Sequence, residues 1–193
     1  MTRALGRSVL AVVVLTLVFG LAYPLVMTGF ARAVFPNRSN GSLIERDGKV
    51  VGSKLVAQKF TSPRYFHPRP SAVDYNAAGT SFANLGPTNP DLAKNVRSAA
   101  QAILKLERPY NPGLTIDDIP VDAVTTSGSG IDPDISLANA RLQSARIAAV
   151  RHLSKERVQQ LIDESTDGRS LGFLGEPGVN VLELNLALDK EAS

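Results

Sequence analysis

The 193-residue sequence contains no cysteine and no tryptophan, and its only two histidines, His67 and His152, lie far apart in the chain. Without cysteine the chain can form neither a disulfide nor a thiolate nucleophile, and it cannot build a Cys-ligated zinc or iron–sulfur site. Two widely separated histidines also argue against a His-rich metal centre. We therefore predict no metal site and no metal cofactor.

The body of the chain also lacks an excess of positive charge. The formal net charge is +3, and the first 34 residues, which hold Arg3, Arg7, Arg32 and no acidic residue, supply all of it. The other 18 of the 21 Lys and Arg residues are balanced by 18 Asp and Glu residues. A neutral body lacks the basic surface that contacts a phosphate backbone, so we predict no nucleic-acid partner.

One long uncharged stretch lies near the N-terminus. Ser8 to Ala31 are 24 consecutive residues without a charge, and a helix of that length spans about 36 Å, enough for a hydrocarbon core of about 30 Å. The alternative is a cleaved signal peptide, with Ala31-Arg32-Ala33 as the cleavage site. The apolar run is longer than the roughly 7–15 residues typical of a signal peptide. We predict a basic tail at 1–7 and a retained transmembrane helix at 8–33 in contact with the lipid bilayer.

The charges that flank this helix indicate its orientation. Arg3 and Arg7 crowd a very short tail, which favours a cytoplasmic N-terminus, although Arg32 and Arg38 on the other side weaken the contrast. The remainder of the chain is then expected to lie outside the cytoplasm.

Residues 34–42 form a turn-rich linker, and residues 43–193 indicate one small mixed α/β soluble domain. Asp47-Gly48 predicts a hairpin whose second strand continues through residues 54–60. Apolar spacing predicts helices at 90–106, 135–153 and 155–164, with Asn89 and Ser154 as N-caps. Strands are predicted at 119–126 and, from the alternating leucines, at 179–188. The expected fold class is α/β: a single N-terminal transmembrane helix followed by this domain.

Residues 61–90 contain five prolines interleaved with the aromatic residues Tyr65, Phe66, Tyr75 and Phe82. This proline density excludes regular strand or helix, and the aromatic content is unlike that of a disordered linker. We predict an ordered loop that either packs internally or docks on a partner.

Two short motifs invite a ligand-binding interpretation. Ser127-Gly128-Ser129-Gly130 lies between a predicted strand and a predicted helix, where backbone N–H groups can bind phosphate, but it lacks the Lys-Ser/Thr of a P-loop and fits a flexible turn. Asp132 and Asp134 resemble the start of a calcium loop. The Gly and Glu that such a loop requires are missing, so we interpret both as acidic residues at a helix start.

Other polar residues are candidates for catalysis or anion binding. His67 could act as a general base, but no nucleophile motif accompanies it, and a structural histidine in a packed loop is the simpler interpretation. Arg141, Gln143, Arg146 and Arg151 could bind an anion, but we interpret them as a solvated helix surface. We predict no catalytic residue.

Four blocks together resemble the KdpC family, the C subunit of the bacterial Kdp high-affinity potassium-transporting P-type ATPase. They are Arg64-Tyr65-Phe66-His67-Pro68-Arg69-Pro70-Ser71, Asn84-Leu85-Gly86-Pro87-Thr88-Asn89-Pro90, Ile119-Pro120-Val121-Asp122 with Thr125 to Pro133, and Phe173-Leu174-Gly175-Glu176-Pro177 with Val179 to Asn185. The resemblance is collinear over nearly the whole chain. It departs at Ser81-Phe82-Ala83, at Asp134 in place of a His and at Gly178 in place of an Arg.

The resemblance implies a non-catalytic accessory subunit of an ATP-driven high-affinity potassium-uptake complex in the bacterial inner membrane. Its partners would be a channel-like potassium-binding subunit, the P-type ATPase subunit and a small membrane peptide. It would assemble and stabilise the complex and act as a catalytic chaperone that raises the ATP affinity of the ATPase subunit. The alternative function is that of a membrane-anchored extracytoplasmic hydrolase using His67.

The resemblance also points to site residues. Ser127, Gly128, Ser129, Gly130 and Gln143 are the positions compared with the signature sequence of ABC transporters. An extracytoplasmic body cannot meet cytoplasmic ATP, so we expect any ATP binding to be weak or to need the partner subunit. The residues expected to dock on a partner lie in the proline-rich loop and are Tyr65, Phe66, His67, Asn84, Leu85, Gly86 and Pro87.

Overall fold

The structure, a computed structural model, describes residues 2–191 and divides after Val51 into two compact units. The first unit begins with α1 (Thr2–Leu17), the π-helical turn η1 (Val18–Ala22) and α2 (Tyr23–Val34). Thr2–Val34 form one apolar helix of 33 residues that is long enough to cross a membrane, and its most apolar 18-residue window has a mean hydropathy of 2.6. The predicted boundaries between the tail (1–7), the transmembrane helix (8–33), the linker (34–42) and the soluble domain (43–193) stay predictions.

The π-helical turn explains how this helix passes Pro24. Proline has no N–H to donate and crowds the preceding turn. The N–H of Tyr23 instead bonds to the carbonyl oxygen of Val18, five residues earlier, which widens the helix just before the proline. The helix therefore continues through Pro24 instead of ending there.

After the short helix α3 (Pro36–Ser39), strands β1 (Leu43–Arg46) and β2 (Lys49–Ser53) form the predicted hairpin. Asp47 and Gly48 have φ angles of 53° and 72°, as a two-residue type I′ turn requires. The predicted continuation of the second strand is wrong. A turn follows Ser53, and the N–H of Ala57 bonds to the carbonyl oxygen of Ile131 at 2.9 Å.

The second unit contains four long helices, α4 (Pro90–Glu107), α6 (Leu137–Arg151), α7 (Lys155–Glu164) and α8 (Val181–Glu191). The first three were predicted, and Asn89 and Ser154 cap α4 and α7 through their side chains. The short helices η2 (Ile116–Asp118) and α5 (Val121–Val124) connect α4 to α6. Strands β3 (Asp134–Ile135), β4 (Thr166–Asp167) and β5 (Gly178–Asn180) form an antiparallel sheet in the order β3-β5-β4.

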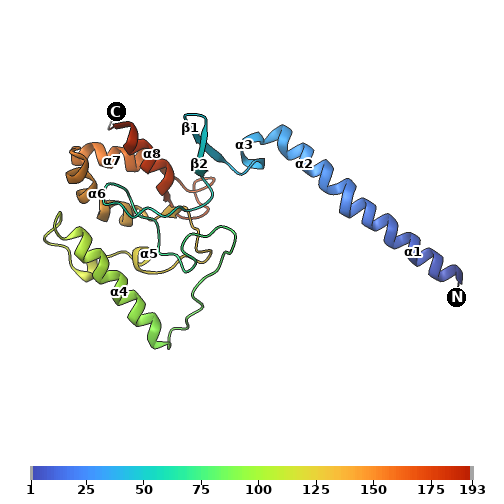
Figure 1. The fold of residues 1–193 in the computed structure, drawn as a ribbon, viewed down its shortest axis with the longest axis horizontal. Helices are drawn as coiled ribbons and strands as arrows, with labels where there is room; N and C mark the ends of the chain where they lie inside the picture. The colour runs from blue at the N-terminus through green and yellow to red at the C-terminus, as the bar shows by residue number, and fades with distance from the viewer. Residues whose placement is uncertain (1, 192–193) are drawn as a thin grey trace. The chain divides into compact units, whose positions relative to one another are not determined.

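Helices α6, α7 and α8 lie together, and α4 lies on the other side of the unit, as Figure 1 shows. The core fills the space between α6, α7, α8 and β5 and includes Phe66, Ile147, Leu161, Leu184 and Leu188. The described residues 54–89 contain no helix or strand, which confirms the predicted loop.

Two predicted strands are wrong. Residues 119–126 contain the helical turn α5, which begins after Pro120, and most of residues 179–188 belong to α8. The leucines of α8 alternate along the sequence, but Val181, Leu184 and Leu188 also follow helical spacing, and these three are buried. A strand would place all the leucines on one face, whereas the helix leaves Leu186 only half-buried.

This difference gives a test of α8. Leu184→Ala should lower the free energy of unfolding by about 2–5 kcal/mol, because it leaves a cavity in the core. Leu186→Ala, the matched control, should lower it by less than about 1 kcal/mol, since Leu186 is half-buried. Urea unfolding of the detergent-solubilised chain, followed by circular dichroism, measures both. Equal losses would contradict the helix.

Candidate functional site

Two side-chain amides hold the proline-rich loop against the helices of the second unit. The Gln143 Oε1 of α6 accepts the N–H of His67 at 2.8 Å, and its Nε2 donates to the His67 carbonyl oxygen at 3.1 Å. The Asn185 Oδ1 of α8 accepts the N–H of Phe66 at 2.8 Å, and its Nδ2 donates to the Phe66 carbonyl oxygen at 3.0 Å. We call these paired amides the amide clamp. They satisfy the backbone N–H and carbonyl groups of two consecutive residues, a task that strand pairing performs in a β-sheet.

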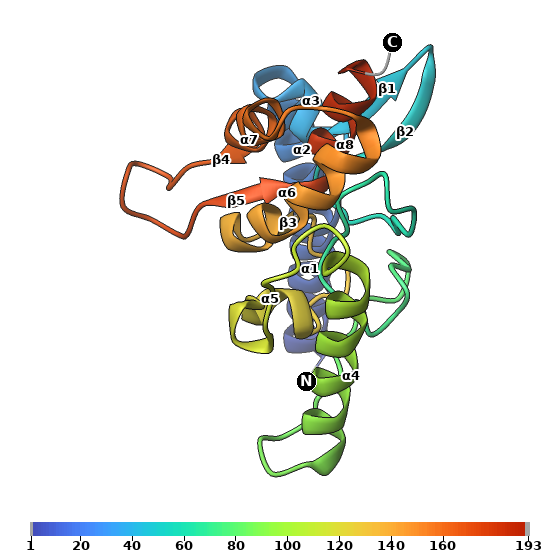
Figure 2. The same cartoon turned by 90° about the vertical axis from the view of Figure 1, so that its left-hand side faces the viewer.

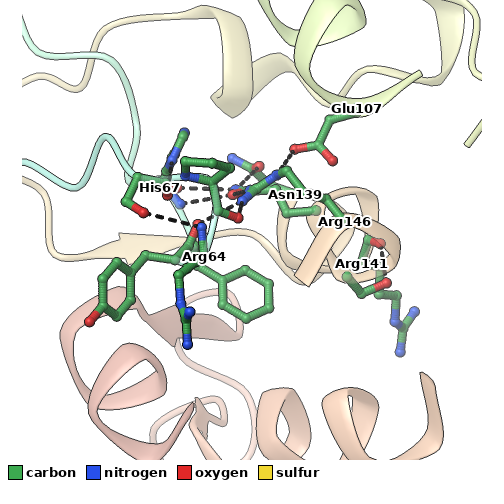
Figure 3. A network of polar contacts seen from close by, with 12 residues as sticks. Arg64, His67, Glu107, Asn139, Arg141 and Arg146 are labelled. Carbon is green, nitrogen blue, oxygen red and sulfur yellow. Dashed lines mark hydrogen bonds and ion pairs between the residues drawn. The ribbon is translucent and has the colours of Figure 1, made fainter. Parts of the chain in front are cut away.

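Arg146 lies beside the amide clamp and is fully buried (Figure 3). Its Nε donates to Glu107 Oε1 at 2.8 Å, and its Nη2 donates to Gln143 Oε1 at 2.9 Å. Its Nη1 donates to the carbonyl oxygens of Pro63 and Tyr65. A single guanidinium therefore connects α4, α6 and the proline-rich loop.

Glu107 is the acidic partner of this buried pair. Its Oε1 binds Arg146, whereas its Oε2 is buried and has no hydrogen-bond partner among the described residues. Burial raises the pKa of the Glu107 carboxyl, and the charge and hydrogen bond of Arg146 oppose that shift. Removing either partner would leave the other buried without compensation.

The prediction of a solvated helix surface on α6 is wrong for three of its four residues. Gln143 and Arg146 are buried, and the side chain of Arg151 is 3% exposed and forms an ion pair with Asp189 at 2.9 Å. Only Arg141 is exposed, and Figure 3 shows it pointing away from the network. Because backbone carbonyls and carboxylates already occupy the arginine donors, the buried residues do not form an open anion site either.

The environment of His67 favours the structural interpretation over the catalytic one. Its Nε2 lies 3.0 Å from the carbonyl oxygen of Ser62, to which it must donate a proton. Burial lowers the pKa of His67, the hydrogen bond to Ser62 opposes this, and the positive charge of Arg146 adds to the lowering. Among residues 2–191, no hydroxyl or carboxylate is hydrogen-bonded to its ring, so the nucleophile that a hydrolase requires is not in place.

The Ser127–Gly130 turn is fastened to the proline-rich loop. The N–H of Ser127 donates to the Pro70 carbonyl oxygen at 3.1 Å, and the carbonyl oxygen of Gly130 accepts the hydroxyl of Ser71 at 2.6 Å. Gly130 has a φ of +74°, and a Cβ there would lie 2.6 Å from Val73. The glycine is thus required for close approach of the two segments, and the turn is anchored at both ends.

The position that a phosphate would take at the start of α6 is already filled. Asp122 accepts the N–H of Ser136 at 2.9 Å, its hydroxyl at 2.8 Å and the Asn139 Nδ2 at 3.0 Å. The prediction that Asp132 and Asp134 mark a helix start is therefore wrong, since Asp134 lies in β3 and α6 begins at Leu137. Nor does a strand precede the Ser127–Gly130 turn, because α5 does.

Gln143 and Gly128, two of the residues predicted to bind nucleotide, line different cavities. A cavity of about 220 Å³ between α4, α6 and the proline-rich loop is lined by Gln143, Glu107 and His67 among others. A second cavity, of about 290 Å³, is lined by Gly128 together with Phe82, Asn84, Leu85 and residues of α4 and α5. Within residues 2–191, no group of three or more His, Asp or Glu side chains could hold a metal ion.

The residues predicted to dock on a partner separate into two groups. Phe66 is fully buried in the core, and Tyr65 and His67 are half-buried beside it. Asn84, Gly86 and Pro87 are exposed, with Leu85 half-buried among them. Phe66 therefore supplies core packing, and docking by the exposed residues stays a prediction.

Sequence reasoning missed Glu107, Asp122, Asn139 and Asn185. The signal for the last was a polar residue on the apolar stripe of α8.

Comparison with known proteins matches the sequence of this chain to a family. Residues 5–190 match the KdpC family, described as "K+-transporting ATPase, c chain". The chain belongs to the KdpC family. A potassium-transporting ATPase KdpC subunit of Methylobacterium nodulans is 49% identical, over 100% of this chain and 99% of its own length. KdpC subunits of Mycobacterium tuberculosis H37Rv (47%; 98% and 100%) and Methylococcus capsulatus (51%; 94% and 95%) are similarly close.

KdpC is a subunit of the K+-transporting ATPase, which implies a complex of several subunits and association with a membrane. Two of the KdpC-like blocks come together in this structure. The block at 64–71 supplies the backbone held by the amide clamp, and the block at 125–133 fastens to it through Ser127 and Gly130.

The amide clamp can be tested by removing one of its amides. Gln143→Ala leaves the N–H and carbonyl of His67 without partners, which should lower the free energy of unfolding by about 2–4 kcal/mol. Gln101→Ala, the same change at an exposed position of α4, should alter it by less than about 0.5 kcal/mol. Urea unfolding measures both variants. A loss at Gln143 no larger than that at Gln101 would contradict the clamp.

Proposed function

We propose that the chain is a non-catalytic accessory subunit of an ATP-driven potassium-uptake complex, which it assembles and stabilises. Its partners would be the channel-like potassium-binding subunit, the P-type ATPase subunit and a small membrane peptide. The sequence has no Asp-Lys-Thr-Gly motif, so the aspartate phosphorylated during transport must belong to another subunit. The observation that carries the proposal is the rigid mounting of a loop whose outer part is exposed.

That outer part, residues 76–90, is suited to protein contact. It contains no charged residue, and it presents Phe82 at an exposed position next to the second cavity. The segment begins directly after Tyr75, whose hydroxyl donates to the Arg69 carbonyl oxygen at 2.9 Å. At its C-terminal end it leads into Asn89, the N-cap of α4. A preorganised, uncharged surface loses little entropy on binding and demands no paired charge from its partner.

We place the second unit outside the cytoplasm of a bacterial inner membrane. The basis is the basic tail with Arg3 and Arg7 in front of the apolar helix Thr2–Val34. With this orientation, the effect of the subunit on ATP affinity would run through the ATPase subunit and not through its own contact with nucleotide.

Docking by the outer loop can be tested in the assembled complex. Phe82→Ser combined with Leu85→Ser should reduce co-purification of the chain with the other transporter subunits by about tenfold or more, because apolar contact area is lost. Tyr110→Ser, an exposed aromatic between α4 and η2, is the matched control and should leave co-purification unchanged. If the double variant remains in a complex that transports potassium normally, the loop is not a docking surface.

Direct nucleotide binding can be tested on the full-length chain in detergent. We expect calorimetric titration with ATP and Mg²⁺ to show millimolar affinity at best, since Asp122 fills the start of α6 and the turn offers no Lys or Arg. Gly128→Val is a suitable probe, because a Cβ at Gly128 meets no atom within 4 Å. Micromolar affinity that this variant abolishes would contradict both the expectation and the placement of the unit outside the cytoplasm.

A further inference from the structure

The segment that connects β4 to β5 carries three exposed apolar side chains close together, and one of them, Leu171, is the most exposed large apolar residue in the described part of the second unit. Leu171 is 83% exposed, Phe173 69% and Leu174 49%. Figure 2 shows this segment, which we call the apolar tip (residues 168–177), projecting away from the helices of the unit. The Phe-Leu-Gly-Glu-Pro motif belongs to it, yet these side chains contribute nothing to the core. Exposed apolar clusters of this kind mark contact sites.

The apolar tip has a defined shape. Ser170 and Leu174 exchange two backbone hydrogen bonds of 2.9 Å, and Arg169 forms an ion pair with Glu176 at 2.8 Å across its base. Leu171 has a φ of 55°, a conformation that is unfavourable for a residue with a branched side chain. The hydrogen bonds therefore hold the backbone of Leu171 in a locally unfavourable conformation, so that Leu171 and Phe173 are presented on a preformed turn.

The base of the apolar tip is fixed to the fold. Thr166 pairs with Val179 and Asp167 with Gly178 in the β4–β5 ladder. Val179 is fully buried, and the Thr166 hydroxyl donates to the carbonyl oxygen of Ile162 in α7 at 2.6 Å. A contact at the tip would therefore act on the core through a short, rigid sheet.

We propose that the apolar tip docks on another subunit of the potassium-transporting complex, inserting Leu171 and Phe173 into an uncharged apolar pocket. This rests on the proposed function, since it requires that the chain be a subunit of such a complex. The occupant is a protein because the tip is uncharged at its apex, and the basic residues at its base are already paired, Arg169 with Glu176 and Lys54 with Asp167. Residues 166–178 hold Arg169 against Asp167 and Glu176, with no lysine, tyrosine or tryptophan. Segments that bind a bilayer surface carry basic and interfacial aromatic residues instead.

Photo-cross-linking in the assembled complex tests the occupant. The photoreactive residue p-benzoylphenylalanine is placed at position 173 of the full-length chain, expressed with the other transporter subunits and irradiated in native membranes. We expect a cross-linked product between the chain and another subunit. A product with lipid, a product with a second copy of the chain, or no product would each overturn the proposal.

A pair of variants measures the contribution of the tip. Leu171→Ser combined with Phe173→Ser should weaken retention of the chain in the detergent-purified complex by about tenfold or more, with an unchanged circular dichroism spectrum because both side chains are exposed. Val121→Ser, at a position that is 73% exposed on α5, is the matched control and should be retained like wild type. Full retention of the tip variant would overturn the proposal. Failure of the wild-type chain to co-purify would instead contradict the proposed function, so the two failures are distinguishable.

Discussion

The buried guanidinium of Arg146 is the interaction on which the second unit depends. An arginine removed from water costs several kcal/mol unless its donors are satisfied, and here they bind Glu107, Gln143 and the backbone of residues 63 and 65. These partners come from α4, from α6 and from a loop without secondary structure of its own. The position of α4 relative to α6 and the path of the loop are therefore set by the same side chain. Moving α4 away would separate the buried charges of Arg146 and Glu107, and moving the loop away would leave N–H donors of Arg146 without acceptors.

This construction explains how a proline-rich segment can be rigid. Its prolines prevent the regular backbone hydrogen bonds of a β-sheet, so hydrogen bonds from side chains take their place. The amide clamp binds both polar groups of Phe66 and His67, and Ser71 binds the carbonyl oxygen of Gly130. The inner part of the loop is held in this way, and its uncharged outer part extends from this anchored base. The apolar tip follows the same principle with different means, since a short sheet and an ion pair hold it outward. Both are exposed surfaces on an anchored support, which suits the proposed role in assembling other subunits.

Features set by interactions between residues close together in the sequence could be predicted, and features set by contacts between distant residues could not. The helices α4 and α7 were predictable because Asn89 and Ser154 cap them from within a few residues, and the hairpin because Asp47-Gly48 alone sets its turn. Helix α8 was mistaken for a strand because its leucines satisfy both periods, and only the packing of Leu184 and Leu188 against α6 and α7 decides between them. The site was largely hidden for a similar reason. Gln143 binds a residue 76 positions away and Asn185 one 119 positions away, and no local pattern encodes such a pairing.

The proposed effect on ATP affinity can be reconciled with a subunit that does not hold nucleotide. In this structure Asp122 binds Ser136 at the start of α6, and Gln143 and Gly128 line different cavities, so these two residues do not share one pocket within residues 2–191. A subunit that raises ATP affinity without contacting ATP must bind the ATP-loaded conformation of its partner more tightly than the empty one. Thermodynamic linkage makes this reciprocal: a tenfold gain in ATP affinity corresponds to about 1.4 kcal/mol of coupling, and ATP must tighten subunit docking by the same factor. Rigid docking surfaces favour such coupling, because a flexible surface would adapt to both conformations and distinguish neither. The rigidity that Arg146 and the amide clamp impose is therefore the physical property that the proposed chaperone role requires.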